Sequence, residues 1–158
     1  MRITLYNTEL NNDLHCTLVK EKTWNYSGCQ VCNTPETIAT VFNDIFRLNR
    51  QSEEYLYMIC FNVRMKPLGI FKISQGTVNS SLCSPREIFL KSFLSNATAI
   101  TIIHNHPSQD VTPSQEDIIV YEKLKDAGNF IGIHFLDSII VGNGYYSFYE
   151  NYENRKEK

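Results

Sequence analysis

The chain has 158 residues, of which 42% are hydrophobic and 20% charged, so it can build one sizeable core but not two full domains. Its formal charge of −2 supplies no basic field that would attract nucleic acid. We expect no membrane span and no targeting segment, because the N-terminus turns polar almost at once, and the odd number of cysteines, five, favours a reducing, cytoplasmic location.

In chain order, the sequence predicts three parts. Residues 1–33 contain short strand-like pieces and form an N-terminal extension or hairpin whose role and partner stay open. Residues 34–150 form the main domain, and residues 151–158 form a charged, flexible tail.

The main domain is predicted to contain three helices. The first begins at Thr34-Pro35 and carries an apolar stripe, namely Ile38, Val41, Phe42 and Ile45. The second begins with a capping box from Ser84 to Glu87 and ends near Leu94. The third begins at Ser114 and ends with Gly128 as its C-cap.

Strands are expected between these helices, at residues 55–62, 68–75, 97–103, 130–136, 138–141 and 145–149. A loop is expected at residues 76–84, and Asn143-Gly144 predicts a hairpin turn before the last strand.

Three side chains with metal-binding chemistry lie within fourteen residues. His104 and His106 follow the buried strand at 97–103, and their spacing places both imidazoles on one face at the strand's C-terminal end. Asp117 lies in the first turn of the third helix, from where it can turn back toward that end. Two histidines and one carboxylate leave a fourth position for water at ligand distances of roughly 2.0–2.2 Å. The spacing therefore predicts one Zn²⁺ per chain and makes a zinc hydrolase the leading hypothesis.

Each of these residues also has an ordinary structural interpretation. Ser114 followed by Asp117 at the third helical position is a capping pattern, which stabilises a helix start by about 1 kcal/mol and is compatible with metal binding. His104 and His106 taken alone could be strand-end histidines.

Cys29 and Cys32 form a Cys-x-x-Cys pair that could bind zinc or act as a redox dithiol. Zinc would need two more ligands, for which His15 and Cys16 are the nearest candidates, and a redox role would need a suitable following helix. We expect two ordinary thiols in a loop.

The histidine and aspartate motif resembles that of the JAMM metalloproteases, also called JAB or MPN+ proteins, and the flanking sequence resembles their bacterial RadC-type branch. The resemblance covers about residues 34–150, and further matching stretches occur in family order at 74–81, 85–89, 96–97, 132–133, 136–137 and 139–142. It implies an α/β fold, an α+β sandwich of JAB/MPN type, with a mixed central sheet, about three flanking helices and a zinc site at a strand end.

By this resemblance, the metal ligands are His104, His106 and Asp117, and Ser114 is the serine that helps to hold the reacting oxygen. The implied activity is hydrolysis of a peptide or isopeptide amide by metal-activated water, so the expected partner is a protein or peptide substrate. Neither the identity of the substrate nor the oligomeric state follows from the resemblance.

The family's general base is a glutamate just before the strand at 55–61, and both Glu53 and Glu54 stand there. Aligning Phe61-Asn62 with a hydrophobic-Asp turn of the family favours Glu54, although both glutamates could also be a solvated strand edge. In the implied mechanism Glu54 takes a proton from the attacking water and returns it to the leaving amine, while Ser114 donates to the developing oxyanion.

The chain departs from the family pattern at Gln109, where Gly is common, and at Ser138, where His is usual. Longer RadC chains have an N-terminal helix-hairpin-helix region linked to DNA binding, which residues 1–33 are too short and too strand-like to supply. Two alternatives therefore stay open beside hydrolysis of an amide. One is a non-catalytic MPN-type interaction scaffold, and the other is an accessory role in DNA repair or in a mobile element, with nuclease activity as a weaker variant.

Overall fold

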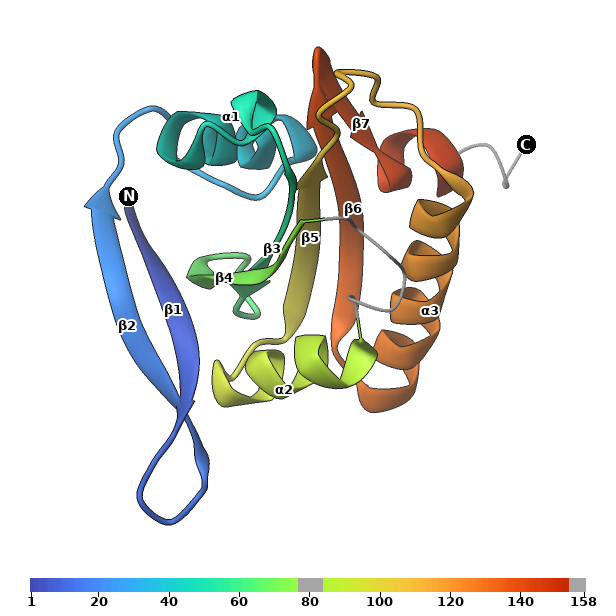
Figure 1. Cartoon of the computed structure of the whole chain (residues 1–158). Helices are drawn as coiled ribbons and strands as arrows, with labels where there is room; N and C mark the ends of the chain where they lie inside the picture. The colour runs from blue at the N-terminus through green and yellow to red at the C-terminus, as the bar shows by residue number, and fades with distance from the viewer. Residues whose placement is uncertain (77–83, 154–158) are drawn as a thin grey trace.

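The computed structural model describes residues 1–76 and 84–153 and shows one mixed sheet in the described part, with strand order β2-β1-β4-β3-β5-β6-β7 (Figure 1). The strands are β1 (Arg2–Leu10), β2 (Cys16–Asn25), β3 (Glu54–Phe61), β4 (Pro67–Gly76), β5 (Ala99–Asn105), β6 (His134–Gly142) and β7 (Gly144–Ser147). The helices are α1 (Pro35–Phe46), α2 (Pro85–Leu94) and α3 (Gln115–Ile131), with a 3₁₀ turn η1 (Leu48–Arg50) and a π-helical turn η3 (Tyr149–Glu153). The β1–β4 and β5–β6 pairs are parallel and the other pairs are antiparallel.

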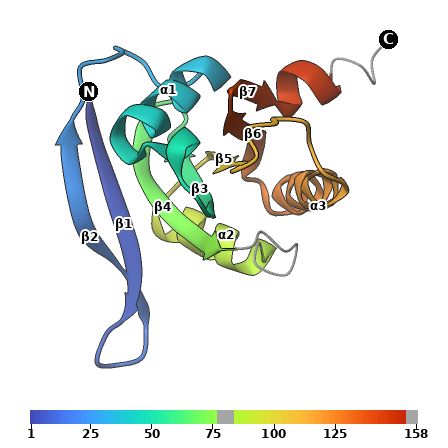
Figure 2. The same cartoon turned by 45° about the horizontal axis from the view of Figure 1, so that its top comes forward.

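The two faces of the sheet are covered by different helices, as Figures 1 and 2 show. Helix α1 packs on one face, against the apolar cluster that contains Phe42, Ile59 and Ile103. Helices α2 and α3 pack on the other face, against the cluster that contains Met58 and Ile102. The predicted α/β fold, with a mixed sheet and three helices, is therefore confirmed.

The first 25 residues form a hairpin that joins the main sheet. Strand β1 runs parallel to β4 and pairs with it at Leu5–Ile70 and Tyr6–Phe71, and Ile3 is buried in the α1 cluster. Beyond these pairs the hairpin bends away from β4 (Figure 2). The predicted hairpin is thus an extension of the sheet, held by parallel pairing that no local pattern in the sequence predicts.

Helix α1 begins where its sequence predicts. The Thr34 hydroxyl accepts a hydrogen bond from the Thr37 backbone N–H, and the Thr37 hydroxyl accepts one from Thr34 N–H, which completes a capping box. The predicted stripe faces the sheet, with Val41 and Phe42 fully buried. One face of this helix therefore supplies much of the second core.

Helix α2 spans the predicted residues, but its predicted capping box is wrong. The Ser84 side chain makes no capping hydrogen bond. Glu87 instead forms ion pairs with Arg86 at 2.7 Å and Lys91 at 3.4 Å. The Glu87 carboxylate is thus paired with two neighbouring cations, and no capping box forms.

The predicted end of the third helix is also wrong. Helix α3 continues through Gly128 to Ile131 and ends at Gly132, which has φ of 77° and donates its N–H to the Gly128 carbonyl. At Gly128 an added Cβ would lie 2.5 Å from the Ile133 carbonyl oxygen, so this glycine allows close helix–strand packing. Phe130 is consequently helical and not in a strand.

The two strands predicted after this helix are one strand, β6, with a register irregularity opposite Ile100 and Thr101. The predicted turn after it is present, with Gly144 at φ of 101°, but β7 ends at Ser147 and the chain then enters η3. The predicted loop at 77–83 and the end of the tail at 154–158 lie outside the described residues. In the described part, no helix is both long enough and apolar enough to cross a bilayer.

Candidate metal centre

Strand β5 delivers both histidines to one point. It is buried along its length between β3 and β6, and the His106 N–H extends the β6 ladder by donating to the Val141 carbonyl at 3.0 Å. His104 is 3% exposed, and its Nε2 lies 3.2 Å from Nε2 of His106. The predicted arrangement of the two imidazoles on one face is therefore present.

Helix α3 brings Asp117 to the same point. Its carboxylate is 6% exposed, with Oδ1 3.1 Å from His104 Nε2 and Oδ2 3.4 Å from His106 Nε2. The candidate ligand atoms of these three residues all lie within 4.8 Å of one another. Among residues 1–76 and 84–153, this is the one group of three or more potential ligands that meets this criterion.

The hydrogen bonds around the group suit metal binding. His106 Nδ1 donates to the Asp110 carbonyl at 2.7 Å, so the proton that His106 gives up on metal binding is the one on Nε2, and the resulting lone pair faces the other ligands. A backbone carbonyl is a common second partner of metal-binding histidines because it fixes the tautomer and the ring orientation.

Charge at the centre favours an ionised carboxylate. Burial alone would raise the pKa of Asp117, but hydrogen bonds from His104, His106 and Ser114 hold it well below its usual range. The hydrogen bond to Asp117 raises the pKa of His106, burial opposes this shift, and the Asp110 carbonyl and the charges of Asp117 and Glu54 add to it. Two imidazoles and an anionic carboxylate are a donor set that fits a divalent ion such as Zn²⁺.

Ser114 holds the Asp117 carboxylate in place. Its hydroxyl donates to Asp117 Oδ2 at 2.7 Å, its N–H donates to the same oxygen at 2.8 Å, and the Asp117 N–H donates back to the hydroxyl at 3.2 Å. The capping interpretation is therefore confirmed. The role of Ser114 toward a reacting oxygen stays a prediction.

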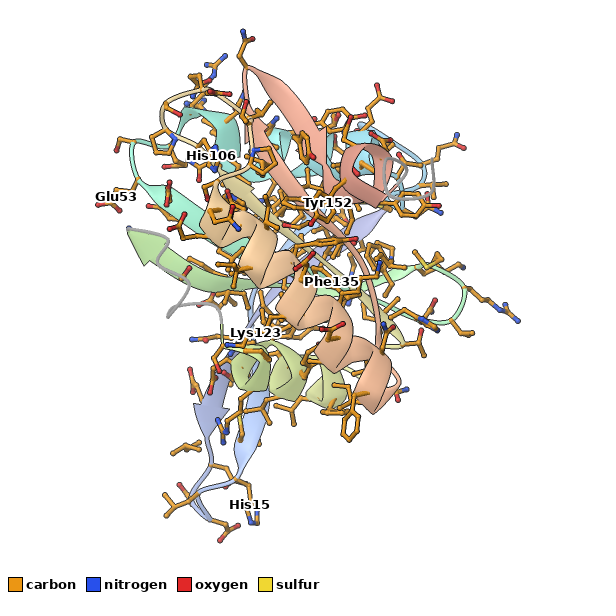
Figure 3. The ribbon with its side chains drawn as sticks, turned by 90° about the vertical axis from the view of Figure 1, so that its right-hand side faces the viewer. His15, Glu53, His106, Lys123, Phe135 and Tyr152 are labelled. Carbon is orange, nitrogen blue, oxygen red and sulfur yellow. The ribbon has the colours of Figure 1, made fainter. Side chains whose placement is uncertain are left out.

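The two candidate bases differ in their surroundings. Leu56 pairs with His104 across the β3–β5 ladder, so Glu54, two residues earlier, belongs to the same face as the histidines. Glu53 lies before the strand; its side chain accepts a hydrogen bond from Gln75 Nε2 at 2.8 Å and points outward in Figure 3. The geometry therefore supports Glu54 over Glu53, and its catalytic role stays a prediction.

Two further residues shape the centre, of which sequence reasoning singled out Gln109 but missed Asn105. Asn105 is 1% exposed and bonds through its side chain to the backbone on both sides of Glu54. Gln109 has φ of 68°, a left-handed conformation in which glycine is favoured, and its Nε2 donates to the Asn49 carbonyl at 3.0 Å. The sequence carried a signal for Gln109, because Gly is common at that position in the family. For Asn105 the only signal was its position between two histidines.

The cysteine pair lies apart from this centre. Cys32 is fully buried, and burial, with the charge of Cys29 adding to it, raises the pKa of its thiol to about 12, which makes it a poor nucleophile. His15 is at the tip of the β1–β2 hairpin, far from His106 in Figure 3. In the described part of the chain, neither His15 nor Cys16 joins the pair in a ligand cluster.

Comparisons with known proteins agree with the geometry. The model of the RadC-like JAB domain family matches residues 32–154. A UPF0758 protein of Clostridium tetani is 47% identical over 94 residues, which cover 60% of this chain and 41% of the relative. A UPF0758 protein of Desulfitobacterium hafniense is 42% identical over 117 residues, which cover 73% of this chain and 50% of the relative. A UPF0758 protein of Moorella thermoacetica is 42% identical over 115 residues, which cover 72% of this chain and 49% of the relative.

The chain spans about half the length of the curated relatives it matches. The family match, by contrast, covers most of the chain and includes the whole candidate centre. The chain therefore belongs to the RadC-like JAB domain family.

Proposed function

We propose that this chain is a zinc-dependent hydrolase of the JAMM type that cleaves a peptide or isopeptide amide bond. The observation that carries the proposal is the meeting of His104, His106 and Asp117 at a buried strand end, with all three ligand atoms within 4.8 Å. Membership of a JAB family supports a hydrolytic role. The substrate is proposed to be a protein or peptide, and a cytoplasmic location, argued from cysteine usage, is part of the same proposal.

His104, His106 and Asp117 would hold the ion. Zn²⁺ in such a donor set supplies a Lewis acid that lowers the pKa of water to about 7 and polarises a carbonyl. The chain's own contribution is to keep the carboxylate ionised, to orient both imidazoles and to bring the three ligand atoms within 4.8 Å of one another.

Glu54 is the proposed proton carrier. It belongs to the face of β3 that meets the histidines, and its charge acts on His106. There it accepts a proton from the attacking water and returns it to the nitrogen of the leaving amine.

Ser114 is proposed to act in two ways. Its single hydroxyl proton is directed at Asp117 Oδ2, so its first effect is to orient that carboxylate. Donation to a developing oxyanion requires the same proton, and therefore a rotation of the hydroxyl away from Asp117.

A second candidate function rests on a different observation. Phe93 and Phe130 are 58% and 93% exposed, and they border an apolar groove of about 400 Å³ between α2 and α3. Exposed aromatic side chains beside an apolar groove favour an interaction surface. A non-catalytic scaffold would use this surface and would not need the metal.

Elemental analysis tests the main proposal directly. Protein purified without an affinity tag should carry about one zinc per chain, and His106→Ala should lose it. Glu54→Gln should keep the metal and lose turnover in a screen of peptide and isopeptide substrates. Absence of metal from the wild type, even after zinc is offered at neutral pH, would favour the scaffold.

A further inference from the structure

Asn105 stands between the two histidines and faces the other way. Because side chains alternate along β5, His104 and His106 belong to the α3 face of the sheet, and Asn105 belongs to the α1 face. Its carboxamide is buried and fully engaged with backbone groups of the segment that precedes and begins β3. A buried amide with such partners is a fixed link between two segments.

The two stronger hydrogen bonds of Asn105 enclose a single residue. Its Oδ1 accepts from the Tyr55 N–H at 2.8 Å, and its Nδ2 donates to the Glu53 carbonyl at 2.9 Å. A longer bond from Nδ2 reaches the Gln51 carbonyl at 3.4 Å. Glu54 lies between the first two partners, so the Asn105 side chain holds the peptide groups on both sides of it.

These bonds begin where the ladder between the two strands stops. The last β3–β5 pair is Leu56–His104, and beyond it the Asn105 side chain takes the place of a backbone partner. On its other edge this end of β3 is held by β4, through the Tyr55–Gln75 and Glu54–Gly76 pairs. Without Asn105, the Glu54 segment would be held from the β4 side and would have lost its direct link to β5.

We propose that Asn105 is a positioning residue that fixes Glu54 relative to His104 and His106. This inference rests on the proposed function, since it assigns to Asn105 the placement of the proposed base. One residue thereby joins the two halves of the site, because its own neighbours in the chain are the proposed ligands and its side chain holds the proposed base.

Asn105→Ala removes both enclosing bonds and leaves the imidazoles untouched. A displacement of a catalytic group by about 1 Å can cost about 100-fold in rate, so we expect kcat to fall by about that factor. KM and the zinc content should stay close to wild type, because neither ligands nor substrate contacts are removed. Faster hydrogen exchange at the Tyr55 amide should accompany the loss.

Two further variants separate positioning from general damage to the strand. Ile103→Ala truncates a fully buried neighbour on the same face of β5, so it should destabilise the fold while leaving kcat near wild type. Its Tyr55 exchange should also match wild type once the rates are corrected for the change in global stability. Asn105→Ser keeps a neutral polar group at this buried position but is too short to make both bonds to the backbone around Glu54. It should fall between wild type and Asn105→Ala, and it keeps the test decisive if the alanine variant fails to fold.

Crystal structures of zinc-loaded wild type and variants provide a readout that does not depend on activity. A displaced Glu54 beside unmoved histidines supports the inference, and an unmoved Glu54 with wild-type Tyr55 exchange overturns it. Full turnover in Asn105→Ala, with turnover lost in Glu54→Gln, would also overturn it. Full turnover in both Asn105→Ala and Glu54→Gln would instead remove Glu54 from the proposed mechanism. The hydrogen exchange of Tyr55 and the crystal structures would then decide whether Asn105 positions Glu54.

Discussion

Replacement of Ser114 by alanine removes the hydroxyl that joins the start of α3 to the Asp117 carboxylate. Two hydrogen bonds are lost, from the hydroxyl to Oδ2 at 2.7 Å and from the Asp117 N–H to the hydroxyl at 3.2 Å. The Ser114 N–H remains and still donates to Oδ2 at 2.8 Å, so the carboxylate keeps part of its support.

Three magnitudes follow from these contacts. Loss of the cap should lower the free energy of unfolding by about 1 kcal/mol. Loss of a group that orients a metal ligand should weaken zinc binding by about 10-fold to 100-fold. If the hydroxyl also reaches the oxyanion, kcat at saturating zinc should fall by a further factor of about 10² to 10³.

Thr34→Ala is a matched control for this variant. Thr34 caps α1 with the same capping-box geometry and is not part of the metal centre, so it should lose about the same folding free energy and bind zinc normally. Urea unfolding and competition with a chelating dye would measure the two quantities. Equal zinc affinity in Ser114→Ala and Thr34→Ala would refute the proposed link between capping and metal binding.

Three other predictions test the surrounding structure. Burial raises the pKa of Asp137 to about 6, so the stability it contributes is present below about pH 4 and lost as pH rises through 6. Urea unfolding should show that the wild type loses about 3 kcal/mol of unfolding free energy by pH 7 relative to Asp137→Asn, and parallel pH profiles of the two proteins would contradict this. Gln109→Ala should lower stability by about 1 kcal/mol because the bond to Asn49 is lost, whereas Gln109→Gly should be close to neutral because glycine relieves the left-handed backbone. Equal melting temperatures of the two variants would count against this explanation. Gly128→Ala should lower stability by about 1–3 kcal/mol despite the better helix propensity of alanine, because the new methyl would meet the Ile133 carbonyl, and an unchanged melting temperature would show that the packing adapts.

Much of the candidate site could be predicted because its parts are local. The His104–His106 spacing determines a shared face on any strand, and the Ser114–Asp117 spacing determines a capping box on any helix. The pattern could not predict that α3 approaches the end of β5. This approach depends on how the helix packs against the assembled sheet.

The errors at the helix ends have different physical origins. Gly128 and Gly132 are both plausible helix ends by local rules, and the choice between them is made by the close contact of Gly128 with the Ile133 carbonyl. The Ser84 capping box is absent, and the Glu87 carboxylate pairs with Arg86 and Lys91 instead. At Gly128 a tertiary contact outweighed a local preference of about 1 kcal/mol, whereas at Ser84 local ion pairs of comparable size stand where the cap was predicted.

By itself the sequence determined the candidate site residues, because imidazole and carboxylate side chains and their periodicity are local properties. The tertiary structure decided how those residues are held. It brought Asp117 within 3.4 Å of both histidines, attached the N-terminal hairpin to β4, and directed Asn105 to the backbone around Glu54. These relations join residues as many as 65 positions apart, and only the burial of two apolar clusters on opposite faces of one sheet brings such residues into contact.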